Sequence, residues 1–297
     1  MLIDDGANGV PALGELLRRW SLPLAPMITL SIALALYVRG WNVARVTRER
    51  ELPIWRAASF LAGVVLLWMA LASPIDALDD YLLAAHMIQH FILMSVAPPL
   101  IVLGAPVVPM LRGMPRVLIH GLLRPLFRSG WIRGVGRVVT HPVFAWIAMN
   151  VAYLGWHVPT AFELTFRSEG IHDCEHVCFF ATSLAFWWVV LRPWPAPVRW
   201  PRWAMIPYLL SADVVNTVLS ATLAFSGRVL YPSYVAAPRI CFLTPLKDQV
   251  AAGAEMWVLN SLVMLVPAVA IAVRELSPRF LVKPVTSGGI ARQVQQG

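Results

Sequence analysis

Residues 80–103 read DYLLAAHMIQHFILMSVAPPLIVL, and this stretch decides the fold class. It carries one acidic residue at its start and is otherwise mostly apolar. A helix needs about 20 such residues to cross the hydrocarbon core of a bilayer. Pro98 and Pro99 predict a kink, which a membrane helix tolerates when neighbouring side chains bond the freed carbonyls. We therefore predict a membrane-spanning helix here.

The rest of the chain has the composition of a membrane protein. Hydrophobic residues make up 58% of its 297 residues and charged residues only 13%, against about 25% charged residues in a soluble domain. We predict an all-α, polytopic membrane helical bundle of about seven transmembrane helices. The expected spans are residues 22–40, 54–73, 80–103, 141–159, 172–191, 204–225 and 248–273.

The organisation follows from these spans. We expect an N-terminal extracytoplasmic tail at residues 1–21, a transmembrane domain at 22–275 and a flexible cytoplasmic tail at 276–297. Acidic residues in the first twenty positions and the lack of a basic segment before the first apolar run argue against a cleavable signal peptide. Three cysteines are too few for a disulfide framework.

Loop charges predict the orientation in the membrane. The loop between the third and fourth spans carries six arginines and no acid, at Arg112, Arg116, Arg124, Arg128, Arg133 and Arg137. Basic loops stay in the cytoplasm, so the N-terminus is expected outside and the C-terminus inside. The net charge of +8 then reflects orientation, and we expect no nucleic-acid partner. The tryptophans near span ends fit an aromatic belt beside the lipid headgroups.

Five of the seven histidines fall at or just inside the predicted outer edge of the bundle: His86, His90, His157, His172 and His176. His86 and His90 are one helical turn apart, as are His172 and His176, so each pair shares a helix face. Ionisable side chains bordering transmembrane helices are costly and are functional candidates. The alternative is that each pair only hydrogen-bonds a neighbouring helix. Convergence of three spans favours a metal site, for which neutral imidazole is a suitable ligand.

Two further residues are candidate ligands. Asp248 and Met256 share a face of the seventh span, and Met94 lies one turn below His90. Thioether ligands favour Cu(I), so we predict copper, although methionine is also common packing in apolar cores. Glu255, Asp213 and Asn216 are polar groups at greater depth that form either interhelical hydrogen bonds or a polar path. The cysteines at positions 174 and 178 point away from the histidine face, and we interpret them as small buried residues.

The motifs resemble one family. HMIQHFILMSVAPPLIVLGAP at 86–106, GWHVP around His157, HDCEH at 172–176, LYPSY at 230–234 and DQVAAGAEMW at 248–257 resemble the CtaG-like family of integral-membrane assembly factors for caa-type cytochrome c oxidase. The resemblance runs from about residue 25 to about residue 275. Glu255 stands where we expect an apolar residue, and Cys174 with Cys178 is not part of the family pattern.

The resemblance implies a non-enzymatic assembly factor in the bacterial inner membrane that handles copper for a haem–copper oxidase. The family's histidines map onto the five above, and its Asp-Gln and Met-Trp pairs map onto Asp248, Gln249, Met256 and Trp257. The expected partners are oxidase subunits or a periplasmic copper chaperone. Two alternatives stay open: a redox protein with haem b between two histidines, and a copper transporter.

Overall fold

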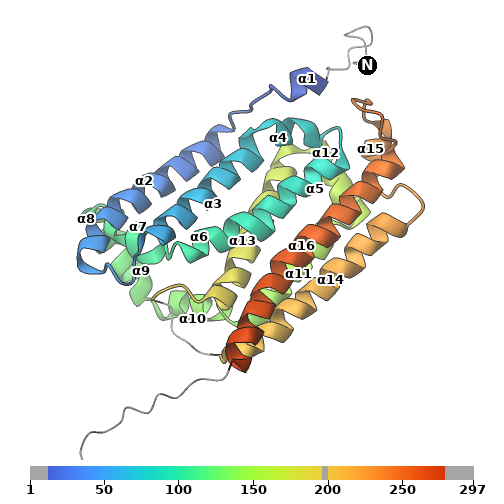
Figure 1. Ribbon diagram of the computed structural model, residues 1–297. Helices are drawn as coiled ribbons and strands as arrows, with labels where there is room; N and C mark the ends of the chain where they lie inside the picture. The colour runs from blue at the N-terminus through green and yellow to red at the C-terminus, as the bar shows by residue number, and fades with distance from the viewer. Residues whose placement is uncertain (1–12, 196–199, 278–297) are drawn as a thin grey trace, which may run out of the picture.

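The computed structural model describes residues 13–195 and 200–277, and every regular element in this part is helical (Figure 1). The predicted all-α class is therefore confirmed. Five helices are long and continuous: α2 (Leu24–Thr47), α3 (Ile54–Ala72), α13 (Glu169–Leu191), α14 (Met205–Phe225) and α16 (Pro245–Leu276). The predicted flexible tail, residues 276–297, lies outside the described residues from 278 onward, as do residues 1–12 of the predicted N-terminal tail.

The third predicted span is one helix with a local change of winding. It consists of α5 (Leu83–Phe91), the π-helical turn η1 (Ile92–Val96) and α6 (Ala97–Leu103). Pro98 has no N–H to donate to the carbonyl of Met94. The indole Nε1 of Trp187 on α13 donates to that carbonyl instead, at 3.2 Å. A neighbouring helix thus bonds the oxygen that the proline leaves free.

The fourth predicted span begins at a bend. Residues 141–159 correspond to α11 (Pro142–Trp156), which follows α10 (Gly130–Val139) at an angle of 67°. Within the described residues, six helical stretches are long and apolar enough to cross a membrane, or seven if α10 and α11 form one broken span. Exposed apolar residues such as Val151, Val218 and Val266 face outward, as expected of helices in contact with lipid.

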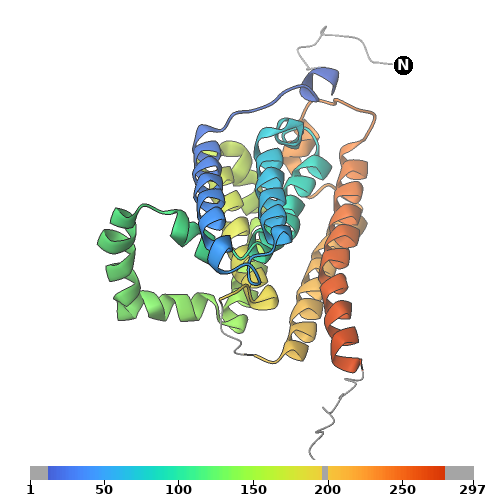
Figure 2. The same ribbon diagram turned by 60° about the vertical axis from the view of Figure 1, so that its left-hand side comes forward.

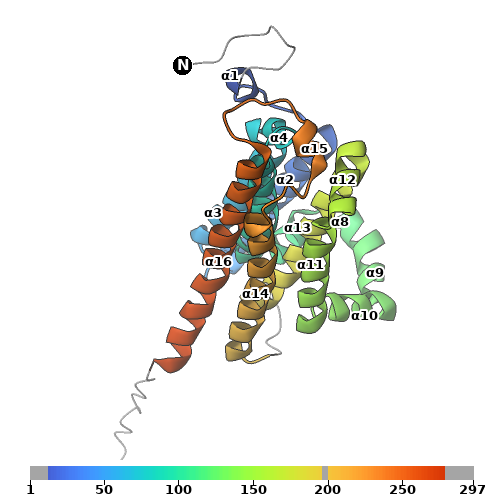
Figure 3. The ribbon, with the colours of Figure 1, turned by 90° about the vertical axis from the view of Figure 1, so that its right-hand side faces the viewer.

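Short elements connect the longer helices, at the ends of the bundle or beside it. They are α1 (Leu13–Leu16), α4 (Pro74–Asp79), α7 (Val107–Gly113), α8 (Arg116–Leu118), the π turn η2 (Ile119–Leu123), α9 (Arg124–Arg128), α12 (Pro159–Arg167), the 3-10 turn η3 (Arg202–Ala204) and α15 (Pro232–Ala236). α4, α12 and α15 lie together at one end, which we call the α4–α12 end (Figures 1 and 3). α10 lies crosswise at the opposite end (Figure 3).

The segment α8–η2–α9–α10 forms an elbow beside the bundle (Figure 2). Five of the six arginines in the predicted cytoplasmic loop belong to it. Since α10 is at the far end from α4 and α12, this basic segment is separated from the acidic turn at α4. Which end faces the cytoplasm stays a prediction.

Helix packing is close enough to exclude side chains at particular glycines. A Cβ atom at Gly40 would lie 1.7 Å from the carbonyl oxygen of Pro109, so α2 and α7 meet backbone to backbone. A Cβ atom at Gly253 would lie 2.8 Å from the carbonyl oxygen of Ser220, where α16 crosses α14. The largest buried cluster involves α5, α11, α13, α14 and α16, and these helices carry the site described next.

Candidate metal centre at the α4–α12 end

The first two histidines lie on α5. His86 and His90 are one turn apart, and their ring centroids are 4.2 Å apart. Both residues are buried, with 2% and 3% of their surface exposed. Asp248 fixes where α5 begins, because its Oδ2 and Oδ1 atoms accept the backbone N–H groups of Leu83 at 2.7 Å and Ala84 at 3.1 Å. These are orphan donors of a helix N-terminus, which a carboxylate satisfies well.

The second pair, His172 and His176, faces the first from α13. These two rings are also 4.2 Å apart. The centroid of His172 lies 5.5 Å from that of His86, and the centroid of His176 lies 5.6 Å from that of His90. The two helices therefore place four imidazoles in a two-by-two arrangement across their contact.

His157 completes the set of five at the end of α11. Its ring centroid is 6.1 Å from that of His90. Its Nδ1 atom lies 2.7 Å from the carbonyl oxygen of Tyr153. A carbonyl only accepts hydrogen bonds, so Nδ1 carries the proton and Nε2 keeps a lone pair, which is the tautomer that a metal ligand needs.

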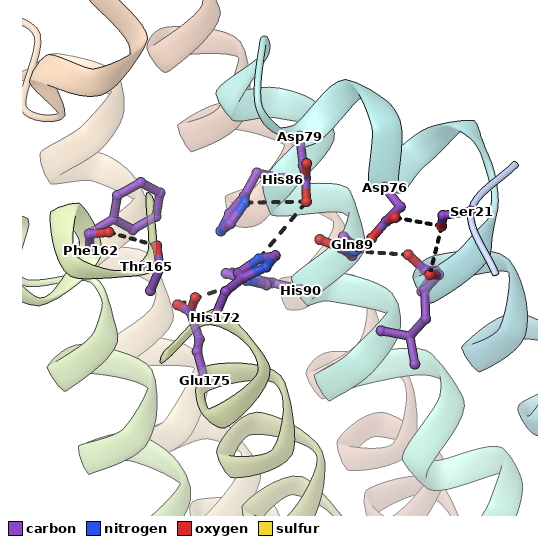
Figure 4. A network of polar contacts seen from close by, with 12 residues as sticks. Ser21, Asp76, Asp79, His86, Gln89, His90, Phe162, Thr165, His172 and Glu175 are labelled. Carbon is purple, nitrogen blue, oxygen red and sulfur yellow. Dashed lines mark hydrogen bonds and ion pairs between the residues drawn. The ribbon is translucent and has the colours of Figure 1, made fainter. Parts of the chain in front are cut away.

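Two carboxylates join the histidines, and sequence reasoning missed both. Oδ2 of Asp79 lies 4.0 Å from Nδ1 of His86 and 3.9 Å from Nε2 of His172. Oε1 of Glu175 lies 3.9 Å from Nε2 of His90. Figure 4 shows these side chains pointing toward one another from α4, α5 and α13. Glu175 carried a signal, since it shares a helix face with His172 and His176, whereas Asp79 depends on how α4 folds back over α5.

The nitrogen and oxygen atoms in this group are too far apart to hydrogen-bond, because such bonds need about 2.7–3.2 Å. Their separation matches a gap that an ion would bridge. Asp79, His86 and His172 offer one ligand atom each with all three atoms within 4.8 Å of one another, and His86, His90 and Glu175 do the same. His86 belongs to both sets.

Most of the buried donor and acceptor atoms here lack a hydrogen-bond partner in the described structure. They are His86 Nε2, both ring nitrogens of His90, His157 Nε2, His172 Nε2, His176 Nε2 and both oxygens of Glu175. An unpaired buried polar atom costs about 1–3 kcal/mol, so a concentration of them marks a place suited to ordered water or to a bound ion.

The group opens toward the α4–α12 end. A cavity of about 30 Å³ is lined there by Asp79, Asp80, His86, Thr165, Phe166 and His172. The side chain of His172 is 23% exposed, whereas His86, His90 and His157 are buried. The outer edge of the group is therefore accessible at His172, whereas the rings behind it are shielded from water.

The loop before α16 covers the group. The hydroxyl of Tyr231 donates to the carbonyl oxygen of His157 at 2.9 Å, and the hydroxyl of Tyr234 donates to that of Asp79 at 2.8 Å. Burial raises the pKa of the Tyr234 hydroxyl well above its ordinary value, so it stays a donor. Gln249 holds the loop by accepting the N–H of Leu230 at 2.7 Å and donating to the carbonyl of Arg228 at 3.0 Å.

The remaining predicted residues lie elsewhere. Both oxygens of Asp248 are occupied by the N-terminus of α5, so its observed contacts are those of a helix cap. Met256 lines a deeper cavity with Met94, His90 and His157. Asp213 accepts a hydrogen bond from Ser261 at 2.8 Å. Cys174 and Cys178 were both predicted to be buried, but Cys174 is exposed and Cys178 is half-buried.

An ion fits this site better than a haem. The cavities at the histidines have volumes of about 30 Å³ and 20 Å³, whereas pockets for larger ligands occupy about 300–1,000 Å³. The ligand atoms come from one group of neighbouring rings, with His86 beside His90 and His172 beside His176. The arrangement suits a small cation with imidazole and carboxylate ligands.

Comparison with known proteins places these features in a family context. The family described as cytochrome c oxidase caa3 assembly factor matches residues 35–277. Uncharacterized proteins of Mycobacterium bovis and Mycobacterium tuberculosis are each 25% identical over 271 residues, covering 88% of this chain and 40% of the relative. An uncharacterized protein of Mycobacterium leprae is 25% identical over 240 residues, covering 79% and 36%.

The chain thus spans about 40% of the length of the two relatives from M. bovis and M. tuberculosis. No solved structure matches it. The family match covers the histidines, both carboxylates and the loop over them, because all lie within residues 35–277.

Proposed function

The chain belongs to the cytochrome c oxidase caa3 assembly factor family, and from this membership we propose that it holds a copper ion at the α4–α12 end and passes it toward the oxidase. One observation carries the proposal: five imidazoles and two carboxylates lie together in a largely buried group, and many of their potential ligand atoms have no hydrogen-bond partner in the described structure. The oxidase that this family helps to assemble needs copper, so a copper site would account for both the family's role and this group of ligands.

The outer part of the group is the proposed entry site. Asp79, His86 and His172 can hold an ion together, and His172 reaches the surface. His90 and Glu175 share His86 with this set and lie deeper. An ion that exchanges one ligand at a time keeps His86 while it moves between the two sets. This geometry supports delivery by ligand exchange rather than permanent storage.

Placement in the cell is part of the proposal. The basic charge of α10, which lies at the opposite end from α4 and α12, favours a cytoplasmic location for this helix. The α4–α12 end then faces the periplasm, on the outer side of a bacterial inner membrane. An oxidase subunit or a periplasmic copper chaperone is the expected partner there. The proposed role is binding and transfer, without a catalysed reaction.

A cell-based experiment tests this function. A strain that lacks the chain is complemented with the wild type, with H86N/H90N, or with H120N/H141N. His120 and His141 are exposed and lie outside the histidine group, so the last variant is a matched control. We expect caa3-type oxidase activity with the wild type and the control but not with H86N/H90N, at equal amounts in the membrane. Full oxidase activity with H86N/H90N contradicts the proposal.

A further inference from the structure

A second cavity lies next to the histidine group and is lined by methionines. Its volume is about 20 Å³, and a cavity of roughly this size holds a single water-sized occupant. Of the 11 methionines in the chain, five line it, and they come from three parts of the bundle: Met87, Met94, Met149, Met256 and Met264. Met87 and Met94 belong to the third span, Met149 to α11, and the last two to α16.

Two buried histidines also line this cavity. His90 and His157 are 3% and 4% exposed. Both ring nitrogens of His90 and the Nε2 of His157 lack a partner in the described structure. The bond from Nδ1 of His157 to the Tyr153 carbonyl leaves the lone pair on Nε2. Unpartnered imidazole nitrogens are therefore available to an occupant of the cavity.

Most other polar groups of the cavity wall have hydrogen-bond partners. The hydroxyl of Ser95 donates to Asn260 Oδ1, and the hydroxyl of Tyr153 donates to Asn216 Oδ1 at 2.8 Å. Asn150 donates to the Trp146 carbonyl at 2.8 Å. Apart from the Asn150 side-chain oxygen, for which no partner is seen among the described residues, the imidazoles and the thioethers are the free ligands that the wall offers. A wall of apolar methionines alone could be packing, but the unpartnered imidazoles beside them point to an ion.

Ligand chemistry identifies the ion. Thioether sulfur is a soft ligand that selects Cu(I), while harder cations prefer oxygen. Imidazole also binds copper. A site of thioethers and imidazole shielded from water matches Cu(I) and offers no carboxylate to a harder ion.

We propose that this cavity is a Cu(I) site, formed by the thioethers of Met94 and Met256 with His90 or His157. The inference rests on the proposed function of the histidine group, because His90 borders both places: its Nε2 atom lies 3.9 Å from Glu175, and the ring lines the cavity. Cu(I) moves from one to the other by exchange of ligands, with no change of oxidation state. The chain then holds copper at an outer imidazole–carboxylate site and at an inner thioether site.

The experiment uses the full chain purified in detergent, with Cys174, Cys178 and Cys241 changed to Ser so that methionine is the only source of sulfur. Cu(I) is added under reducing conditions in competition with a Cu(I)-specific chelator, and bound copper is analysed by X-ray absorption. The inner-site variant is M94L/M256L, because leucine matches methionine in volume. The control is M205L, since Met205 is buried but does not line the cavity. The outer-site variant is H86N/H172N, which leaves the cavity wall intact.

We expect a sulfur shell around copper in the parent, in M205L and in H86N/H172N. M94L/M256L should lose this sulfur shell and should bind about one Cu(I) per chain fewer than the parent. Copper bound through nitrogen and oxygen alone in the parent overturns the inner site but leaves the outer site standing. Absence of bound copper in the parent overturns both. Even if M94L/M256L fails to fold, the spectrum of the parent shows whether thioether sulfur binds the copper.

Discussion

Nε2 of His90 lies 3.9 Å from Oε1 of Glu175, and neither atom has a hydrogen-bond partner in the described structure. Glu175 is fully buried in a bundle that we interpret as membrane-spanning. A carboxylate in that position is expensive unless something pairs with it. The distance is too long for a hydrogen bond and short enough for both atoms to bind one ion. This pair is therefore the clearest structural sign of a metal site.

The first prediction concerns this carboxylate. E175Q keeps the size of the side chain but removes its negative charge, so we expect copper affinity to fall by about 10-fold or more. E169Q, at an exposed glutamate six residues earlier on α13, serves as the control and should bind like the wild type. Competition titration with a chelator measures both. Equal affinity in E175Q and the wild type would remove Glu175 from the ligand set.

The second prediction separates a helix cap from a ligand. Asp248 accepts two backbone N–H groups at the start of α5, so D248N replaces one acceptor with a donor. We expect a loss of stability of about 1–3 kcal/mol, measured by thermal unfolding in detergent. D173N, at an exposed aspartate, is the control. Folded D248N should still bind copper, and an unchanged unfolding midpoint with lost copper would instead identify Asp248 as a ligand.

The third prediction concerns the break in the third span. W187F removes the indole N–H that bonds the Met94 carbonyl, and an unpaired buried carbonyl costs about 1–3 kcal/mol. We therefore expect a lower unfolding temperature for W187F than for W200F, which alters an exposed tryptophan. Equal unfolding temperatures would mean that the freed carbonyl finds another donor.

The fourth prediction is a pH dependence. Imidazole binds a metal only in its neutral form, and its ordinary pKa is about 6.5. Protons and copper therefore compete for the same nitrogens, so copper affinity should fall as the pH is lowered. Chelator competition at a series of decreasing pH values measures the effect. In H86N/H90N the dependence should weaken, and an identical pH profile in that variant would contradict imidazole ligation.

The sequence predicted those features that follow directly from hydropathy and helical periodicity. Apolar stretches located the helices, and one-turn spacing placed His86 with His90 and His172 with His176 on shared faces. Features that depend on tertiary contacts could not be predicted from the sequence. The participation of Asp79 depends on α4 packing over α5, and the role of Asp248 depends on α16 meeting the first turn of α5. No local pattern in the sequence contains those contacts.

The helix before α11 was missed for a related reason. Hydropathy places a span at residues 141–159, where α11 lies, and treats the arginine-rich residues before it as a loop, whereas α10 forms there and meets α11 at 67°. The basic face of α10 requires a polar environment, and the apolar helix α11 does not. The sequence contained both signals, but only the three-dimensional arrangement shows that they belong to one continuous segment that turns.

Elemental analysis of the detergent-purified chain after exposure to copper tests the central claim most directly. The wild type and H120N/H141N should retain at least about one copper per chain after desalting, and H86N/H90N should retain much less. Equal copper in all three proteins, or none in the wild type, would contradict the proposal that the histidine group at the α4–α12 end holds the ion.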